Sequence, residues 1–168
     1  MKVKTEKPIS IREAHKNDIE KVSLLRVNLL KEIGNIKSDA DAIEVLEANR
    51  RYFSKNYGKD ACKIFLAESE GTIIAISTLV RFERPPVAGN LQGLEGHILN
   101  IFTVPEWRGK RLAALLLERI ISYARQNGYS RLWLDAVPEA VSLYKRMGFV
   151  LNHSISTSKA NIDMEMFL

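Results

Sequence analysis

Residues 97–128 place a strand, a short basic turn and a long apolar helix in direct succession. His97 to Val104 is predicted to be a strand, and Pro105 ends it because proline lacks the N–H that a central strand donates. Leu112 to Arg125 is strongly apolar and predicts a buried helix, which the pair Asn127-Gly128 terminates. Because a strand and a buried helix must pack on one another, we expect a layered α/β fold.

The rest of the chain predicts a mixed α/β sheet within a single domain that spans residues 1–168. Alternating or apolar runs indicate strands, and apolar residues at helical spacing between capping residues and glycines indicate helices. The predicted strands are residues 8–13, 63–68, 72–82, 97–104, 131–137, 149–156 and 161–168, and the predicted helices are residues 17–34, 38–58, 112–125 and 138–148. We therefore expect about seven strands flanked by about four helices, with a Gly-rich loop from Arg84 to about Gly96.

Composition is that of an ordinary globular protein, with 46% hydrophobic and 27% charged residues. The one cysteine, Cys62, excludes an intrachain disulfide and suits a reducing compartment. Residues 1–7 lack the apolar run of a signal peptide, and no stretch approaches the ~18 apolar residues of a membrane span. We expect a cytoplasmic protein that does not associate with membranes.

The turn between the strand and the helix predicts an anion site. The first N–H groups of a helix have no partner within the helix, and the helix dipole favours negative charge at that end. Gly109 permits close approach or unusual dihedral angles, while Arg108, Lys110 and Arg111 add positive charge. A basic turn of this kind is also compatible with a solvated helix cap that binds nothing.

Other motifs for phosphate, metal or nucleophile chemistry are absent from the sequence. There is no Gly-x-x-x-x-Gly-Lys-Ser/Thr, no Gly-x-Gly-x-x-Gly and no Gly-x-Ser-x-Gly, and no Cys/His cluster has zinc spacing. We expect no metal. The net charge of +5 is compatible with nucleic acid or with coenzyme A, but no basic patch is interleaved with aromatic residues, so nucleic acid is not expected.

Two motifs together resemble the GNAT superfamily of acetyltransferases. The family signature Arg/Gln-x-x-Gly-x-Gly/Ala falls on residues Arg108 to Ala113, and a second feature, Leu-Tyr-x-x-x-Gly-Phe, falls on Leu143 to Phe149. The element order also matches from Ile9 to Leu168. The resemblance implies a GNAT-like fold and an N-acetyltransferase that moves the acetyl group of acetyl-CoA to a primary amine by direct attack in a ternary complex. We expect this amine to belong to a small molecule, and a protein acceptor is the alternative.

The resemblance also implies which residues hold acetyl-CoA. In the family, the pantetheine arm pairs with the backbone of the strand before the turn, where the N–H of Phe102 is expected to hold the acetyl carbonyl. The expected acetyl-CoA-binding residues are Ile101, Phe102, Thr103, Val104, Arg108, Gly109, Lys110, Arg111, Leu112, Ala113, Ala114 and Tyr144.

The chain departs from the family pattern at two positions. Arg111 stands where the signature has its first glycine. A positive φ at this position would cost a non-glycine residue about 1–2 kcal/mol, so we expect a helical φ with the side chain directed outward or to phosphate. Val137 stands where many relatives carry Asn, which is expected to alter contacts with pantetheine or substrate.

The resemblance places the general acid at Tyr144, because a phenol with a pKa near 10 can donate a proton to sulfur. Packing beside Leu143 and Phe149 is the alternative role of this ring. Counting back from the turn places His97 near the position of the general base, with Glu95 two residues earlier. An ordinary strand residue with a satisfied side chain is the alternative role of His97.

The acceptor is expected to bind near residues 29–36 and 84–96, where Arg84 offers a cation for an acidic group and Asn100 can orient a water or the substrate. Solvated charge and an in-sheet hydrogen bond are the respective alternatives. The sequence also leaves open a non-catalytic acyl-CoA-binding or regulatory module on the same fold. The apolar last strands are compatible with a homodimer through the sheet, as is common in relatives.

Overall fold

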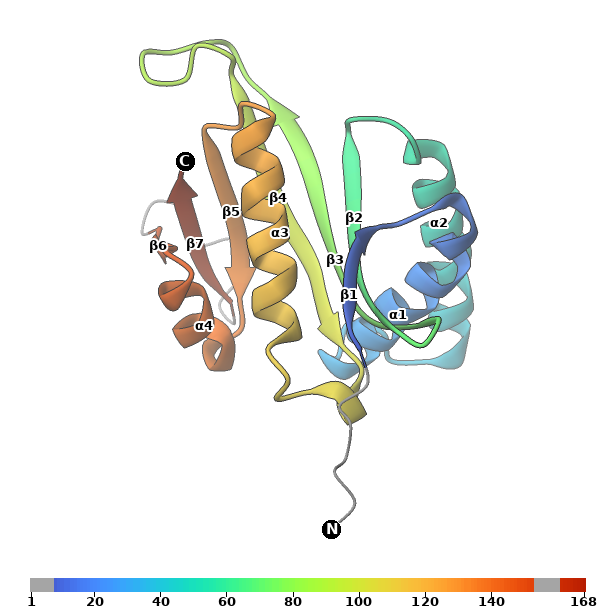
Figure 1. Cartoon of the computed structure of the whole chain (residues 1–168). Helices are drawn as coiled ribbons and strands as arrows, with labels where there is room; N and C mark the ends of the chain where they lie inside the picture. Colours follow the sequence, from blue (N-terminus) through green and yellow to red (C-terminus); the bar gives the residue numbers. More distant parts are fainter. Residues whose placement is uncertain (1–7, 153–160) are drawn as a thin grey trace.

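The computed structural model describes residues 8–152 and 161–168 and contains one seven-stranded sheet with the strand order β1-β2-β3-β4-β5-β7-β6 (Figure 1). The strands are β1 Ser10–Glu13, β2 Cys62–Ser69, β3 Thr72–Glu83, β4 Leu94–Thr103, β5 Arg131–Ala136, β6 Val150–Leu151 and β7 Ile162–Phe167. The helices are α1 Ile19–Glu32, α2 Asp39–Asn56, α3 Leu112–Gln126 and α4 Val141–Arg146, with short 3-10 turns η1 Lys16–Asp18, η2 Pro105–Trp107 and η3 Pro138–Ala140. β4 and β5 are parallel, and the other neighbours are antiparallel.

The predicted mixed sheet of seven strands and four helices is confirmed within the described residues. β4 begins at Leu94, so the loop that starts at Arg84 is shorter than expected, because residues 94–96 pair with β3. α1 begins at Ile19 after η1, whose N-cap is His15 instead of Asn17. The expected strand over 149–156 is observed at Val150–Leu151, and its residues 153–156 lie outside the described part of the chain.

The two faces of the sheet carry different helices and separate hydrophobic cores. α3 packs on one face through the fully buried residues Leu116, Leu117 and Ile120, together with Tyr144 and Phe149 of the α4 region. α1 and α2 pack on the other face, in a core that contains Val22, Leu25, Phe53, Leu66, Ile76 and Phe102 (Figure 1). None of the helices in the described ranges is both long and apolar enough to span a bilayer.

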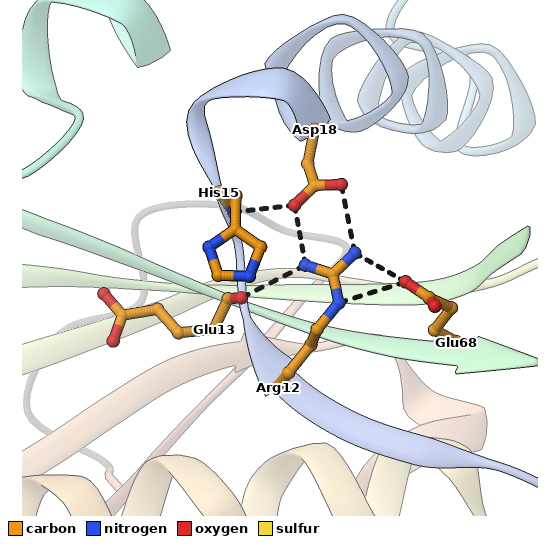
Figure 2. A network of polar contacts seen from close by, with 5 residues as sticks. All are labelled: Arg12, Glu13, His15, Asp18 and Glu68. Carbon is orange, nitrogen blue, oxygen red and sulfur yellow. Dashed lines mark hydrogen bonds and ion pairs between the residues drawn. The ribbon is translucent and has the colours of Figure 1, made fainter. Parts of the chain in front are cut away.

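An arginine at the first strand fixes the start of the helical layer against the sheet. Figure 2 shows the Arg12 guanidinium between the carboxylates of Asp18 and Glu68. Its Nη1 donates to Asp18 Oδ2 at 2.7 Å and its Nε donates to Glu68 Oε2 at 3.0 Å, which joins β1, η1 and β2. The hydrogen bond from Arg12 holds the pKa of Asp18 below its usual range. This charge-assisted network therefore orients α1 as it leaves the sheet.

β4 and β5 pair over three positions only and then separate. The pairs are Glu95 with Arg131, Gly96 with Leu132 and His97 with Trp133, although β4 continues to Thr103 and β5 to Ala136. A bulge in β4 coincides with the separation, because the register with β3 shifts between Ile76 and Thr78. Asn100 takes a left-handed φ of 58° there, and its side-chain Nδ2 donates to Thr78 Oγ1 at 3.2 Å. A bulge bends its strand, so it directs β4 away from β5.

Candidate active site

A cavity of about 930 Å³ lies where β4 and β5 diverge. Its walls come from α1, β4, the basic turn, the first residues of α3, β5 and α4. Of the residues expected to form the site, the structure brings twelve to this cavity: His97, Asn100, Ile101, Phe102, Thr103, Arg108, Gly109, Arg111, Leu112, Ala113, Ala114 and Tyr144. Segments far apart in the sequence thus meet around one hollow of a size that suits a large ligand.

Four expected site residues do not line this cavity: Glu95, Arg84, Val104 and Lys110. The backbone N–H of Val104 donates to Ile74 O at 3.0 Å, so it belongs to the ladder with β3. The Lys110 ammonium lies over the Trp107 ring, 4.5 Å from its centroid. The cavity wall on the basic turn is therefore built from Arg108, Gly109 and Arg111.

The first turn of α3, at the cavity wall, has no side-chain cap from its N-cap residue. Arg111 is the N-cap of α3, and its side chain makes no capping hydrogen bond. The first N–H groups of this helix therefore lack the side-chain acceptor that commonly satisfies them, and Ala113 and Ala114 line the cavity. Uncapped N–H groups, the helix dipole and nearby cations together favour an anion at this point.

The expected helical conformation of Arg111 was wrong. Its φ is 62° and its ψ is 16°, which is the left-handed region, and Gly109 two residues earlier has a φ of 77°. The turn from η2 into α3 requires a left-handed residue at the helix start, which is what a glycine supplies without steric cost in the signature. Arg111 therefore carries backbone strain of about 1–2 kcal/mol, and its side chain is exposed at the cavity wall.

Two substitutions at Arg111 can distinguish the effect of its backbone conformation on stability from the effect of its guanidinium on ligand binding. The free energy of unfolding of Arg111→Gly is expected to be about 1 kcal/mol higher than that of Arg111→Ala. Only glycine relieves the strain of the left-handed conformation, and the greater backbone entropy of unfolded glycine offsets part of that gain. Both variants lack the guanidinium, so both should bind acetyl-CoA about two- to fivefold more weakly than the unmodified chain. Urea unfolding and calorimetric titration measure the two effects. Equal stability of the two variants would contradict the strained conformation.

Arg108 links the basic turn to α1 and β4. Its Nη2 donates to both carboxylate oxygens of Glu32, at 2.9 and 2.7 Å, and its Nε donates to Thr103 O at 3.1 Å. The guanidinium carbon also lies 5.7 Å from the centroid of the Phe102 ring. The position of the turn is thus tied to the end of α1 and to the end of β4.

Tyr144 of α4 is both a core residue and a cavity residue. Its ring is 7% exposed and lies edge-on to Phe149, with 6.1 Å between the ring centroids. Its hydroxyl forms no hydrogen bond with any part of the chain that the structure describes. Burial raises the pKa of Tyr144 to about 12, so the phenol keeps its proton at neutral pH and can donate it to a group in the cavity.

His97 of β4 faces a carboxylate and an aromatic ring. Its Nε2 lies 3.4 Å from Asp135 Oδ2, and its ring stacks on Trp133 with 5.1 Å between centroids and an interplanar angle of 9°. Desolvation lowers the pKa of His97 below the ordinary value, although Asp135 opposes that change. The imidazole is therefore neutral at pH 7 and able to accept a proton.

Asp135 in turn faces Asp163 across the β5–β7 ladder. Burial, followed by the hydrogen bond with Asp135, raises the pKa of Asp163, because two adjacent carboxylates resist simultaneous ionisation. The pair thus provides negative charge beside His97 together with a carboxyl that holds its proton to higher pH.

Glu95 and Arg84 belong to an ion-pair cluster instead. The Glu95 side chain is 6% exposed and lies between Arg84 Nε at 3.0 Å and Arg131 Nη1 at 3.2 Å. Arg131 also donates through Nε to Glu165 Oε2 at 2.6 Å. Both carboxylate oxygens of Glu95 are thus engaged by arginines outside the cavity.

Sequence reasoning did not name five charged residues of the cavity wall as site residues: Arg26, Glu32, Glu118, Asp135 and Arg146. A signal existed for Arg26, because it lies in the inward stripe of α1, four residues after Val22 and three before Leu29. Asp135 likewise shares a strand face with Trp133, two residues away. Glu32 offered no local signal, since its role depends on contact with Arg108.

The chain is similar in sequence to known acetyltransferases. The family model described as "Acetyltransferase (GNAT) family" matches residues 30–149. An uncharacterized N-acetyltransferase from Schizosaccharomyces pombe is 42% identical over 52 residues, which cover 29% of this chain and 32% of that protein. The matched stretch thus spans about a third of the length of this curated relative.

Solved structures resemble the chain over most of its length. A predicted acetyltransferase from Clostridium acetobutylicum, crystallised with acetyl-CoA, is 25% identical with a TM-score of 0.79, and the match covers 90% of this chain and 96% of that chain. The PaiA N-acetyltransferase from Thermoplasma acidophilum, in complex with coenzyme A, is 16% identical with a TM-score of 0.69, covering 96% and 99%. The second likeness concerns the fold. Because the family model covers more than half of its residues, the chain belongs to the acetyltransferase (GNAT) family.

Proposed function

We propose that this chain transfers the acetyl group of acetyl-CoA to the primary amine of a small molecule, by direct attack within a ternary complex. The observation that carries the proposal is the cavity between β4 and β5. Its wall contains the uncapped start of α3 with the basic residues Arg108 and Arg111. The same wall contains His97, which is neutral at pH 7, and Tyr144, which keeps its proton. An anion site and a proton acceptor and donor are the groups that this transfer requires.

The residues present fit acetyl-CoA. The N–H groups at the start of α3, with Arg108 and Arg111, would hold the pyrophosphate. Beyond His97, β4 has no β5 partner on its inner edge, so backbone groups of residues 101–103 are available to pair with the extended pantetheine arm. Acetyl-CoA would supply the thioester, and the amine attacks the carbonyl carbon of its acetyl group.

The cavity residues then carry the proton transfers. His97 removes a proton from the acceptor ammonium or from a water between them, which leaves a nucleophilic amine. A backbone N–H of β4, for which Phe102 is the expected residue, stabilises the oxyanion that forms when the amine attacks the acetyl carbon. As the C–S bond breaks, Tyr144 donates its hydroxyl proton toward the departing sulfur.

Release of free coenzyme A in the presence of a panel of primary amines tests the proposed function. Release that depends on the amine, together with the acetylated amine in a mass spectrum, would support it. Thermal stabilisation by acetyl-CoA without release with any amine would instead indicate a non-catalytic acyl-CoA-binding module.

His97→Gln is expected to abolish the acidic limb of the pH–rate profile. Since His97 acts when neutral and its pKa is lowered, the activity of the unmodified enzyme should stay high at pH 7 and fall as the pH drops through that lowered pKa. The profile of kcat/KM between pH 5 and 8 checks this. His15→Gln, at an exposed position before η1, is the matched control and should keep the limb. Persistence of the limb in His97→Gln would place the base elsewhere.

A further inference from the structure

Arg26 is a cavity residue that the transfer chemistry does not use. It lies on α1 between the buried Val22 and the half-buried Leu29, and its own side chain is half-buried at the cavity wall. Other cavity arginines differ from it, since Arg111 and Arg146 are exposed. A guanidinium on the inward stripe of a helix therefore points to a specific use.

No counter-charge within the described residues balances Arg26. Arg108 pairs with Glu32, but Arg26 has neither an ion pair nor a hydrogen bond with the described part of the chain. Removal of a cation from water without a partner is costly, and desolvation lowers the pKa of Arg26 accordingly. An anion entering the cavity would provide the missing partner.

Arg26 reaches the cavity from the face opposite to the cofactor elements. α1 belongs to the core that contains Val22, Leu25 and Phe102, whereas Tyr144 and the buried side of α3 belong to the core of the other face. If pyrophosphate lies at the start of α3, the anion at Arg26 is a separate group that arrives from the α1 side. That group belongs to the acceptor.

The polar groups of the cavity also indicate where the amine of such an acceptor lies. His97, with Asp135 at 3.4 Å, offers a proton acceptor and negative charge for an ammonium group. Arg26 offers a planar cation whose paired N–H groups match a carboxylate. The two sites together favour a molecule that carries an amine and a carboxylate.

We propose that Arg26 binds the carboxylate of the acceptor, which is therefore a small amino acid-like molecule and not a simple amine or a polyamine. This inference rests on the proposed function, since it names the substrate class of the same cavity.

Matched pairs of compounds test the inference, each pair differing by the carboxylate: tyrosine and tyramine, histidine and histamine, and lysine and cadaverine. With the unmodified enzyme, kcat/KM for the amino acid should exceed that for its decarboxylated partner in at least one pair by about 10- to 100-fold. Arg26→Gln should remove this preference by raising KM for the amino acid, with little change for the amine. Arg26→Lys should retain part of it.

Arg51→Gln, at an exposed arginine of α2, is the matched control and should keep the preference. The melting temperature gives a second readout, because Arg26→Gln removes an unpaired charge and should leave the protein at least as stable as before. A loss of stability with an unchanged preference would show a structural role and overturn the inference. Phosphoethanolamine and ethanolamine form a further pair, and a preference confined to the phosphate would overturn the carboxylate assignment.

Different outcomes bear on the carboxylate site at Arg26 and on the acetyl transfer itself. Acetylation of both members of every pair at equal rates would overturn the role of Arg26 and leave the transfer reaction intact. If no amine is acetylated, the transfer reaction fails, and Arg26 is judged by thermal shift with the amino acids in the presence of acetyl-CoA. Stabilisation of the unmodified chain but not of Arg26→Gln would then support the carboxylate site, and equal shifts would overturn it.

Discussion

Tyr144→Phe is expected to lower kcat about 100-fold while KM for acetyl-CoA changes by less than about twofold. The substitution removes only the hydroxyl, so the ring retains its edge-on contact with Phe149 and the core keeps its volume. The hydroxyl has no hydrogen-bond partner among the described residues, so its loss disrupts no contact that the structure shows. Steady-state kinetics at saturating acetyl-CoA measure the effect.

The chain offers a close control for this experiment in Tyr129. That residue is 6% exposed, and burial raises its pKa to about 12, as it does for Tyr144, but it does not line the cavity. Tyr129→Phe should therefore leave kcat unchanged. If kcat is unchanged in Tyr144→Phe as well, Tyr144 only packs in the core and does not donate a proton.

Glu95→Ala is expected to lower the free energy of unfolding by about 3 kcal/mol. Its carboxylate lies between the guanidiniums of Arg84 and Arg131, and the Arg131 side chain is only 16% exposed. Loss of the carboxylate removes one of the two acidic partners of Arg131 and leaves the other, Glu165, to balance it. Urea unfolding followed by circular dichroism measures the change.

A matched control for Glu95 lies at the end of the neighbouring strand. Glu83 pairs with Arg81, but its side chain is 66% exposed, so Glu83→Ala should cost less than about 1 kcal/mol. Activity per folded molecule is the second readout, because Glu95 lies outside the cavity and kcat should change little. A large fall in kcat with normal stability would instead support Glu95 as a base.

The local motifs were readable from the sequence because each depends on neighbouring residues. The turn at Arg108 and Gly109 follows a strand and opens an apolar helix, and in the segment Leu143 to Phe149 the short helix is followed by Gly148. Such features can be predicted without knowledge of contacts between distant residues. The order of strands and helices followed from periodicity for the same reason.

The features that the sequence did not reveal depend on contacts between distant segments. The left-handed φ of Arg111 is imposed by the path of the turn, and propensity alone favoured the opposite conformation. The separation of β4 from β5 follows from the bulge near Asn100. Glu95 was expected near the site because it precedes His97 by two residues, yet the arginines around it come from 36 residues away and from a loop. A cytoplasmic location and a dimer through the last strands stay predictions.

The three-position junction between β4 and β5 also affects how rigid the molecule is. So short a ladder supplies few hydrogen bonds, and the hydrophobic core that α3 shares with β4 and β5 adds to the contact between the two strands. The same helix presents its first turn to the anion site. A change in the packing of α3 is therefore expected to alter this shared core and the anchoring of the ligand together.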